Sequence, residues 1–127
     1  LGGPGVIAAS LANPECRLED LDLSQSNIGD EGTATLADSL RNNQRLTRMS
    51  LRGNNITARG WNAFSSILCD TSSINASYIS NHTLRDLDGD GAQIPQDVEM
   101  MLDLNQGNDK RRVAAIKILQ AHRHLDM

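Results

Sequence analysis

Apolar and polar positions recur along this chain with a long period. The segment from Leu18 to Ile28 aligns with the segment from Leu46 to Ile56 at an offset of 28 residues, and every apolar position matches. Both copies follow the pattern L-x-x-L-x-L-x-x-N-x-L, in which Ser26 replaces the asparagine of the first copy. The match continues through Gly32 and Gly60 into residues with apolar positions at helical spacing. The sequence therefore predicts two units, each with a short strand and a returning helix.

The polar positions of each unit have predictable structural uses. Leu18, Leu21 and Leu23 alternate along the first strand, and we expect all three to face the core. Asn54 lies where the chain turns out of the second strand, so its side chain is expected to bond backbone groups of the turn. Helices are predicted over residues 33–40 and 61–68. One unit cannot bury its apolar face alone, so the units must stack.

Incomplete units lie on both sides of these two. Residues 3–11 mirror residues 32–40, with Pro4 suited to a first helical turn. The third strand has two alternatives: a strict 28-residue step leads to Ile74, whereas a 38-residue step leads to Leu84. We favour Leu84 because buried apolar residues determine register, and this choice implies a ten-residue insertion across residues 70–79.

The repeat pattern stops after Asp90 and gives way to two predicted helices. The first starts near Ile94 and carries an apolar stripe at Val98, Met101, Leu102 and Leu104. The second begins at Asn108 and Asp109, with apolar residues at Val113, Ile116, Ile118 and Leu119. We expect repeats over residues 1–93 (a partial repeat 1–17, repeats from 18 and from 46, a partial strand repeat at about 84–89) and a helical C-terminal cap over residues 94–127.

The segment from Leu21 to Gly32 resembles the ribonuclease-inhibitor-like class of leucine-rich repeats, and the 28-residue spacing is similar to that class as well. The resemblance extends over residues 3–88. The cap is similar to C-terminal caps of leucine-rich-repeat proteins from algae such as diatoms. The resemblance implies an α/β leucine-rich-repeat solenoid, with short parallel strands on the concave side and helices on the convex side. It also implies binding of another protein, usually through the concave face.

Composition and charge narrow the classes of function. The net charge is -4, and no basic patch with interleaved aromatic residues favours nucleic acid. No apolar run approaches the roughly 18 residues of a membrane span. Two cysteines, Cys16 and Cys69, make no disulfide framework, so we expect free thiols and an intracellular, cytoplasmic protein. The chain starts at Leu1 rather than Met, which suggests a piece of something longer and an N-terminal edge open to self-association.

The strand residues that point away from the core form the main candidate site. Equivalent positions stack on neighbouring parallel strands about 4.8 Å apart. The three resulting ladders are Asp20, Arg48, Asp86; Asp22, Ser50, Asp88; and Ser24, Arg52, Asp90. They predict a charged surface for a protein partner, although Arg48 and Arg52 would also balance the flanking carboxylates.

A calcium site is a second hypothesis. Asp86, Asp88, Asp90 and Asp97 occupy positions 1, 3, 5 and 12 of a loop with Gly91 at position 6, which suits an EF-hand-type loop. Asp97 in place of glutamate and a preceding strand instead of a helix count against it. An acidic turn leading into the cap is therefore the favoured interpretation, and no other cofactor is expected.

Catalytic patterns do not emerge. The sequence has no glycine-rich phosphate loop or nucleophile elbow, and its three histidines lack a metal-binding spacing. Trp61 is either an exposed interface anchor or, as we favour, a residue packed against the insertion. The leading hypothesis is a non-catalytic protein-binding module. The alternatives are a small accessory subunit of a larger assembly and a calcium-responsive regulator that uses residues 86–97.

Overall fold

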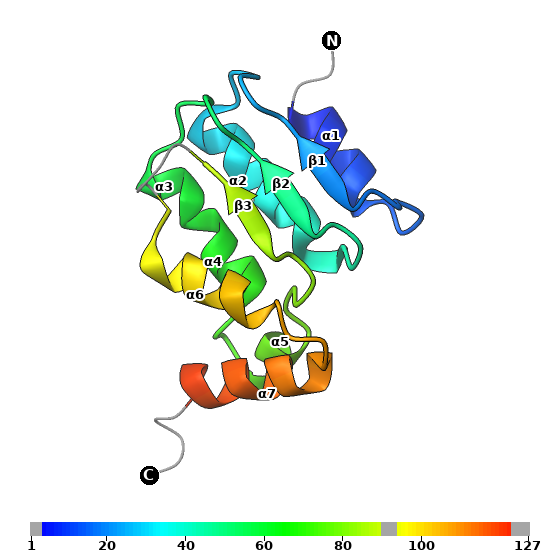
Figure 1. The fold of residues 1–127 in the computed structure, drawn as a ribbon, viewed down its shortest axis with the longest axis vertical. Coiled ribbons are helices and arrows are strands. Elements are labelled where there is room, and N and C mark those ends of the chain that lie inside the picture. Colours follow the sequence, from blue (N-terminus) through cyan, green and yellow to red (C-terminus); the bar gives the residue numbers. More distant parts are fainter. Residues whose placement is uncertain (1–3, 90–93, 123–127) are drawn as a thin grey trace.

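A computed structural model describes residues 4–89 and 94–122 of the chain. Three short strands form one parallel sheet in the order β1-β2-β3. Figure 1 shows helices behind these strands and a separate pair, α5 and α7, at the C-terminal end. The strands are β1 (Asp20–Asp22), β2 (Arg48–Ser50) and β3 (Asp86–Asp88). The helices are α1 (Pro4–Ala12), α2 (Gly29–Ser39), the 3-10 helix η1 (Leu40–Asn42), α3 (Ala58–Trp61), α4 (Ala63–Leu68), α5 (Ile74–Tyr78), α6 (Gln96–Leu104) and α7 (Lys110–Ala121).

The pairing of the strands confirms the longer step to the third strand. Arg48 of β2 pairs with Asp20 of β1 and with Asp86 of β3, which corresponds to the predicted steps of 28 and 38 residues. The ten extra residues contain the five-residue helix α5, whose first turn is capped by Ser73. α5 packs against α7, so the insertion joins the sheet region to the last helix.

The core lies between the inward side of the sheet and the helices. Burial deepens away from β1: Leu21 is half-buried, whereas Met49 of β2 is 0% exposed. Leu18 is 46% exposed, so the expectation that it faces the core is wrong. Leu18 lies before β1, which is one of the two edge strands of the sheet. The apolar residues that are 0% exposed are Leu36, Ala37, Leu40, Leu46, Met49, Phe64, Leu68, Leu84 and Val98.

Asn54 bonds the backbone as predicted and does so across two units. Its Oδ1 accepts hydrogen bonds from the amides of Ser26 (2.8 Å) and Ile28 (3.2 Å) in the preceding turn. Its Nδ2 donates to the carbonyls of Leu23 (2.9 Å) and Arg52 (3.3 Å). The side chain is 0% exposed, and its four bonds tie the turn of one unit to the turn of the next.

The last helix is placed as expected but presents a different face. Asp109 caps α7 by accepting hydrogen bonds from the amides of Arg111 and Arg112. Leu119 is 61% exposed, whereas Val113, Ala114 and Lys117 are buried, so the predicted apolar stripe is wrong at Leu119. The inward face follows the spacing 113, 114, 117, because α7 packs on α5 and on the segment after α4.

Trp61 is a core residue and not an exposed anchor. Its side chain is 1% exposed, and its ring lies 6.1 Å from that of Phe64, centroid to centroid. The ring also lies against the backbone at the end of β3. A Cβ atom added at Gly89 would be 2.6 Å from Cζ2 of Trp61, which is far inside van der Waals contact. The glycine therefore allows the indole ring to pack beneath β3.

Substitution of Gly89 by alanine tests this contact. We expect Gly89→Ala to lower the free energy of unfolding by about 1 to 3 kcal/mol, because the added methyl group overpacks a rigid indole. Urea unfolding followed by the fluorescence of Trp61, the single tryptophan, measures the loss. Gly5→Ala is the control, since an added Cβ there meets nothing within 4 Å. Equal stability of the two variants would contradict the packing described.

Candidate protein-binding face of the sheet

The outward side chains of the three strands form one continuous charged surface, here called the strand face. It comprises Asp20, Asp22, Ser24, Arg48, Ser50, Arg52, Asp86 and Asp88. Strand alternation places them on the side opposite Met49 and Leu87, which are buried. The strand register confirms two of the predicted ladders. Arg48 of β2 pairs with Asp20 of β1 and with Asp86 of β3, and Ser50 pairs in the same way with Asp22 and Asp88.

Arginine side chains bridge the strands within this face. Arg48 lies between two carboxylates, with its Nη1 at 3.6 Å from Oδ2 of Asp20 and its Nε at 3.4 Å from Oδ2 of Asp86. Nη1 of Arg52 lies 3.9 Å from Oδ2 of Asp88. The side chain of Arg48 is 50% exposed, and pairs of this kind contribute about 0–1 kcal/mol to stability. The charges consequently remain available to a partner.

Short polar side chains fix the middle of the strand face. Oδ1 of Asp22 accepts hydrogen bonds from the hydroxyl of Ser24 (2.6 Å) and from its amide (2.9 Å). These bonds, from the hydroxyl first and the amide second, hold the pKa of Asp22 below its usual value. The Ser24 hydroxyl also lies 3.1 Å from that of Ser50. The carboxylate therefore stays ionised and held in one orientation.

Ser50 is less accessible than a docking residue should be. It is 8% exposed, because its short side chain lies between the longer side chains of Asp22 and Asp88 on the neighbouring strands. Its predicted contact with a partner is therefore the weakest of the set. Asp90, the last member of the third ladder, lies outside the described residues.

The residues of the calcium hypothesis have other partners where the structure describes them. Asp86 pairs with Arg48 and Asp88 with Arg52. Asp97 lies in the first turn of α6, where its Oδ2 accepts a hydrogen bond of 3.0 Å from the hydroxyl of Ser65 on α4. Within residues 4–89 and 94–122 no three acidic, histidine or cysteine residues gather as metal ligands. Asp90 falls outside these ranges, so the calcium site stays a prediction.

A buried polar cluster between α7 and the residues that end α4 and follow α5 was not foreseen from the sequence. Lys117 of α7 is 0% exposed, and its Nζ donates to the carbonyls of Leu68 (2.6 Å) and Asn81 (3.0 Å). Burial lowers the pKa of Lys117 to about 7. Burial also raises the pKa of the adjacent Cys69 thiol. In the sequence, one signal indicates the burial of Lys117: it lies four and three residues after the apolar residues Val113 and Ala114, on the same face of the helix.

Within the same cluster, a serine and a histidine lie within hydrogen-bonding distance. Oγ of Ser77 is 2.9 Å from Nε2 of His122, and the Ser77 hydroxyl donates to the carbonyl of Asp70 at 2.6 Å. Ser77 is 0% exposed, so a substrate carbonyl cannot approach its oxygen. This pair joins α5 to the residue that caps the end of α7.

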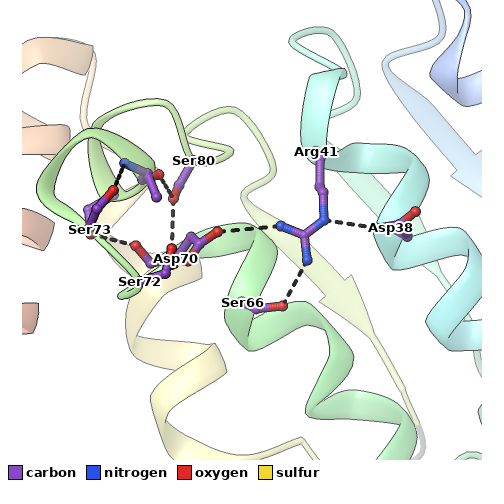
Figure 2. A network of polar contacts seen from close by, with 9 residues as sticks. Asp38, Arg41, Ser66, Asp70, Ser72, Ser73 and Ser80 are labelled. Carbon is purple, nitrogen blue, oxygen red and sulfur yellow. Dashed lines mark hydrogen bonds and ion pairs between the residues drawn. The ribbon is translucent and has the colours of Figure 1, made fainter.

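A second polar network lies away from the strand face, on the helical side of the molecule. Figure 2 shows Arg41 of η1 reaching toward Asp38, Ser66 and Asp70. Its Nε donates to Oδ1 of Asp38 at 2.8 Å, and its Nη1 lies 3.7 Å from Oδ2 of Asp70. The amide and then the hydroxyl of Ser72 hold the pKa of Asp70 below its usual value. This network borders a hollow of about 470 Å³ beside Ile79 and Ser80.

Among the described residues, no helix is both long enough and apolar enough to cross a bilayer. No curated protein matches the chain. A solved structure described as Leiomodin-1 Actin-Binding Site 2 (ABS2) is similar with a TM-score of 0.40 and 14% sequence identity, covering 97% of this chain and 92% of that chain.

Residues 16–37 match the family model described as Leucine Rich repeat. The matched segment contains β1 and most of α2, which together make the first of the two units in the sequence pattern. The second unit pairs its strand with the first in parallel, at the same 28-residue step. The match and this arrangement together support a leucine-rich-repeat protein with a mixed fold of helices and three parallel strands.

Proposed function

We propose that this chain is a non-catalytic protein-interaction module that binds its partner mainly through the strand face. The proposal includes a leucine-rich-repeat solenoid of the ribonuclease-inhibitor-like class over residues 1–93 and a helical cap over residues 94–127. Packing of α6 on α4 and of α7 on α5 supports the cap, because these helices cover the end of the structure beyond β3. The strand face would then be the concave surface.

The charge of the strand face is the observation that carries the proposal. Four carboxylates, those of Asp20, Asp22, Asp86 and Asp88, share the surface with the guanidinium groups of Arg48 and Arg52. The sheet beneath is rigid because Met49 and Leu87 are buried in the core. A rigid surface with an excess of negative charge fits a partner whose contact surface carries lysine or arginine.

Paired charge reversals test this function. The variant Asp20→Arg with Asp86→Arg reverses the strand face, whereas Glu31→Arg with Glu99→Arg makes the same charge change on exposed positions of α2 and α6. Each is used with the native chain as bait in extract from the native source, and captured proteins are quantified by mass spectrometry. We expect a partner whose capture falls about tenfold or more with the strand-face variant only. Equal capture by both variants would refute binding through this face.

An accessory subunit in a larger assembly is a second candidate, and exposed apolar residues near the β1 edge favour it. Val6 of α1 is 61% exposed, and Leu18 before β1 is 46% exposed. Edge strands and apolar patches of this kind are common contacts between chains. In the same capture experiment, a partner lost with Leu18→Lys and retained by both charge-reversed variants would support this candidate instead.

A further inference from the structure

A groove lies on the helical side of the molecule, on both sides of Ile79. The hollow of about 470 Å³ bordered by Arg41 and Asp70 lies on one side of this residue. A second hollow of about 310 Å³ lies on the other side, toward the start of α7. Gln44, Ile79 and Ser80 line both hollows, so the two are parts of one groove.

Exposed apolar residues stand at the centre of this groove. Ile79 is 61% exposed and Tyr78 is 54% exposed. The other two aromatic residues of the chain, Trp61 and Phe64, are buried in the core. Tyr78 is therefore the chain's one exposed aromatic side chain, and tyrosine is among the residues that contribute most to protein interfaces. Both residues belong to the insertion, which the 28-residue repeat does not need for its own packing.

The charged lining of the second hollow is entirely cationic. It consists of Lys110 and Arg111, the first two residues of α7. Nζ of Lys110 donates to the carbonyl of Asn105 at 2.7 Å, and Arg111 is exposed and makes no ion pair with the residues that the structure describes. The carboxylate of the preceding Asp109 is already occupied by the amides of Arg111 and Arg112. The first hollow differs, since Arg41 there is paired with Asp38 and Asp70.

We propose that this groove binds an extended peptide segment of another protein that places an acidic side chain beside an apolar one. The acidic side chain would lie against Arg111 and Lys110, and the apolar side chain would pack on Tyr78 and Ile79. A linear segment fits better than a small anion because the groove continues past Ile79 into the first hollow. Gln44 is an exposed polar residue that lines both hollows along this path.

The occupant differs in charge from the partner of the strand face. That face carries an excess of carboxylates and fits a basic surface, whereas the second hollow of the groove fits an acidic segment. The two sites also lie on different parts of the fold, since one belongs to β1–β3 and the other to the insertion and α7. Loss of one binding activity therefore leaves the other intact, and each proposal can fail independently.

Fluorescence anisotropy with a labelled peptide tests the proposal on the full chain. The probe is a short peptide in which glutamates flank a central pair of leucines. The Arg111→Glu and Ile79→Ser variants are expected to weaken binding about tenfold each. Arg59→Glu, on α3, makes the same charge change at an exposed position away from the groove and should retain native affinity. Circular dichroism confirms that each variant is folded, which is expected because all three side chains are exposed.

Two further probes distinguish the chemistry of the occupant. A peptide with lysine in place of glutamate, and one with serine in place of leucine, should each bind at least about tenfold more weakly. Vesicles of anionic phospholipid should not bind through Arg111. The proposal is overturned by equal affinities of Arg111→Glu and Arg59→Glu, by undiminished binding of either altered peptide, or by Arg111-dependent binding of vesicles without binding of the acidic peptide.

Discussion

Replacing Asn81 with alanine should lower the free energy of unfolding by about 3 to 4 kcal/mol, because four side-chain hydrogen bonds to the backbone are lost at once. Oδ1 of Asn81 accepts hydrogen bonds of 2.9 Å from the amides of Thr83 and Leu84. Its Nδ2 donates to the carbonyls of Leu40 (2.9 Å) and Asn43 (3.0 Å) in the preceding unit. The side chain is 0% exposed, so water cannot replace these bonds without opening the core.

The backbone of Asn81 connects further parts of the structure. Its amide donates a hydrogen bond of 2.8 Å to the carbonyl of Ile67. Its carbonyl accepts hydrogen bonds from Nδ2 of Asn105 (3.2 Å) and Nζ of Lys117 (3.0 Å). Alanine keeps these backbone groups, so the loss that is measured belongs to the side chain alone. Any displacement of the backbone would increase the loss of stability, so the stated range is a lower bound.

Urea unfolding monitored by circular dichroism measures this effect, with Asn75→Ala as the matched control. Asn75 is an exposed asparagine within α5, and its replacement should change stability by less than about 0.5 kcal/mol. If Asn81→Ala unfolds within about 1 kcal/mol of the native chain, the four side-chain bonds do not hold the third unit on the second.

Asn81 also shows how far sequence reasoning extends. The sequence predicted the third strand at Leu84 from its apolar positions, and the residues before Leu84 also resemble those before Leu46. The physical cause is visible in the structure: Asn43 bonds the amides of Arg45 and Leu46 as Asn81 bonds those of Thr83 and Leu84. Because an asparagine side chain shapes the same turn before β2 and before β3, the local pattern indicated the register of these two strands.

The features that sequence reasoning missed depend on long-range contacts. Leu18 before β1 is exposed although its local pattern equals that of Leu46 and Leu84, which are buried before β2 and β3. A packed Trp61 was the favoured prediction, but its contact with Gly89, a residue of a later unit, was not foreseen. In the sequence of its helix, Lys117 is indistinguishable from a solvated lysine. Its amine is buried only because the carbonyls of Leu68 and Asn81, from distant segments, accept its hydrogen bonds.

The strand face was predictable for a different reason. Its ladders follow from strand alternation and from the 28-residue step, so the residues that share a ladder could be read from the sequence once the register of β3 was chosen. The accessibility of each member was not predictable. Ser50 is buried because the longer side chains of its neighbours flank it. The groove beside Ile79 depends on how the insertion packs against α7.

Lys117 makes the stability of the protein depend on pH in a stated direction. The ordinary pKa of 10.5 applies in the unfolded chain, whereas burial lowers the pKa to about 7 in the folded chain. Between these values the unfolded chain binds one more proton than the folded chain at this group. The free energy of unfolding therefore rises with pH across this window, by about 2 to 3 kcal/mol between about pH 7 and about pH 9.

Neighbouring groups set the limits of the measurement. Burial lowers the pKa of His82 from its ordinary value of 6.5, so this residue adds a slope of the same sign only below about pH 7. Burial raises the pKa of Cys69 above its ordinary value of 9.0, and the folded thiol therefore costs stability above about pH 9. Lys110 has a pKa lowered by burial as well, so it contributes with the same sign as Lys117.

The Lys117→Met variant separates the contribution of the amine from these neighbours. Methionine leaves the carbonyl of Leu68 without its Nζ donor, a loss of about 1 to 3 kcal/mol that does not change with pH. The slope of unfolding free energy against pH, measured by urea unfolding at several pH values from about 7 to about 9, should fall nearly to zero in this variant.

Lys110→Met is the control and should retain most of this slope, because Lys110 is only partly buried. A native slope near zero, or an equal slope in native and Lys117→Met chains, would mean that the amine stays protonated in the core and that the carbonyls of Leu68 and Asn81 compensate for its burial.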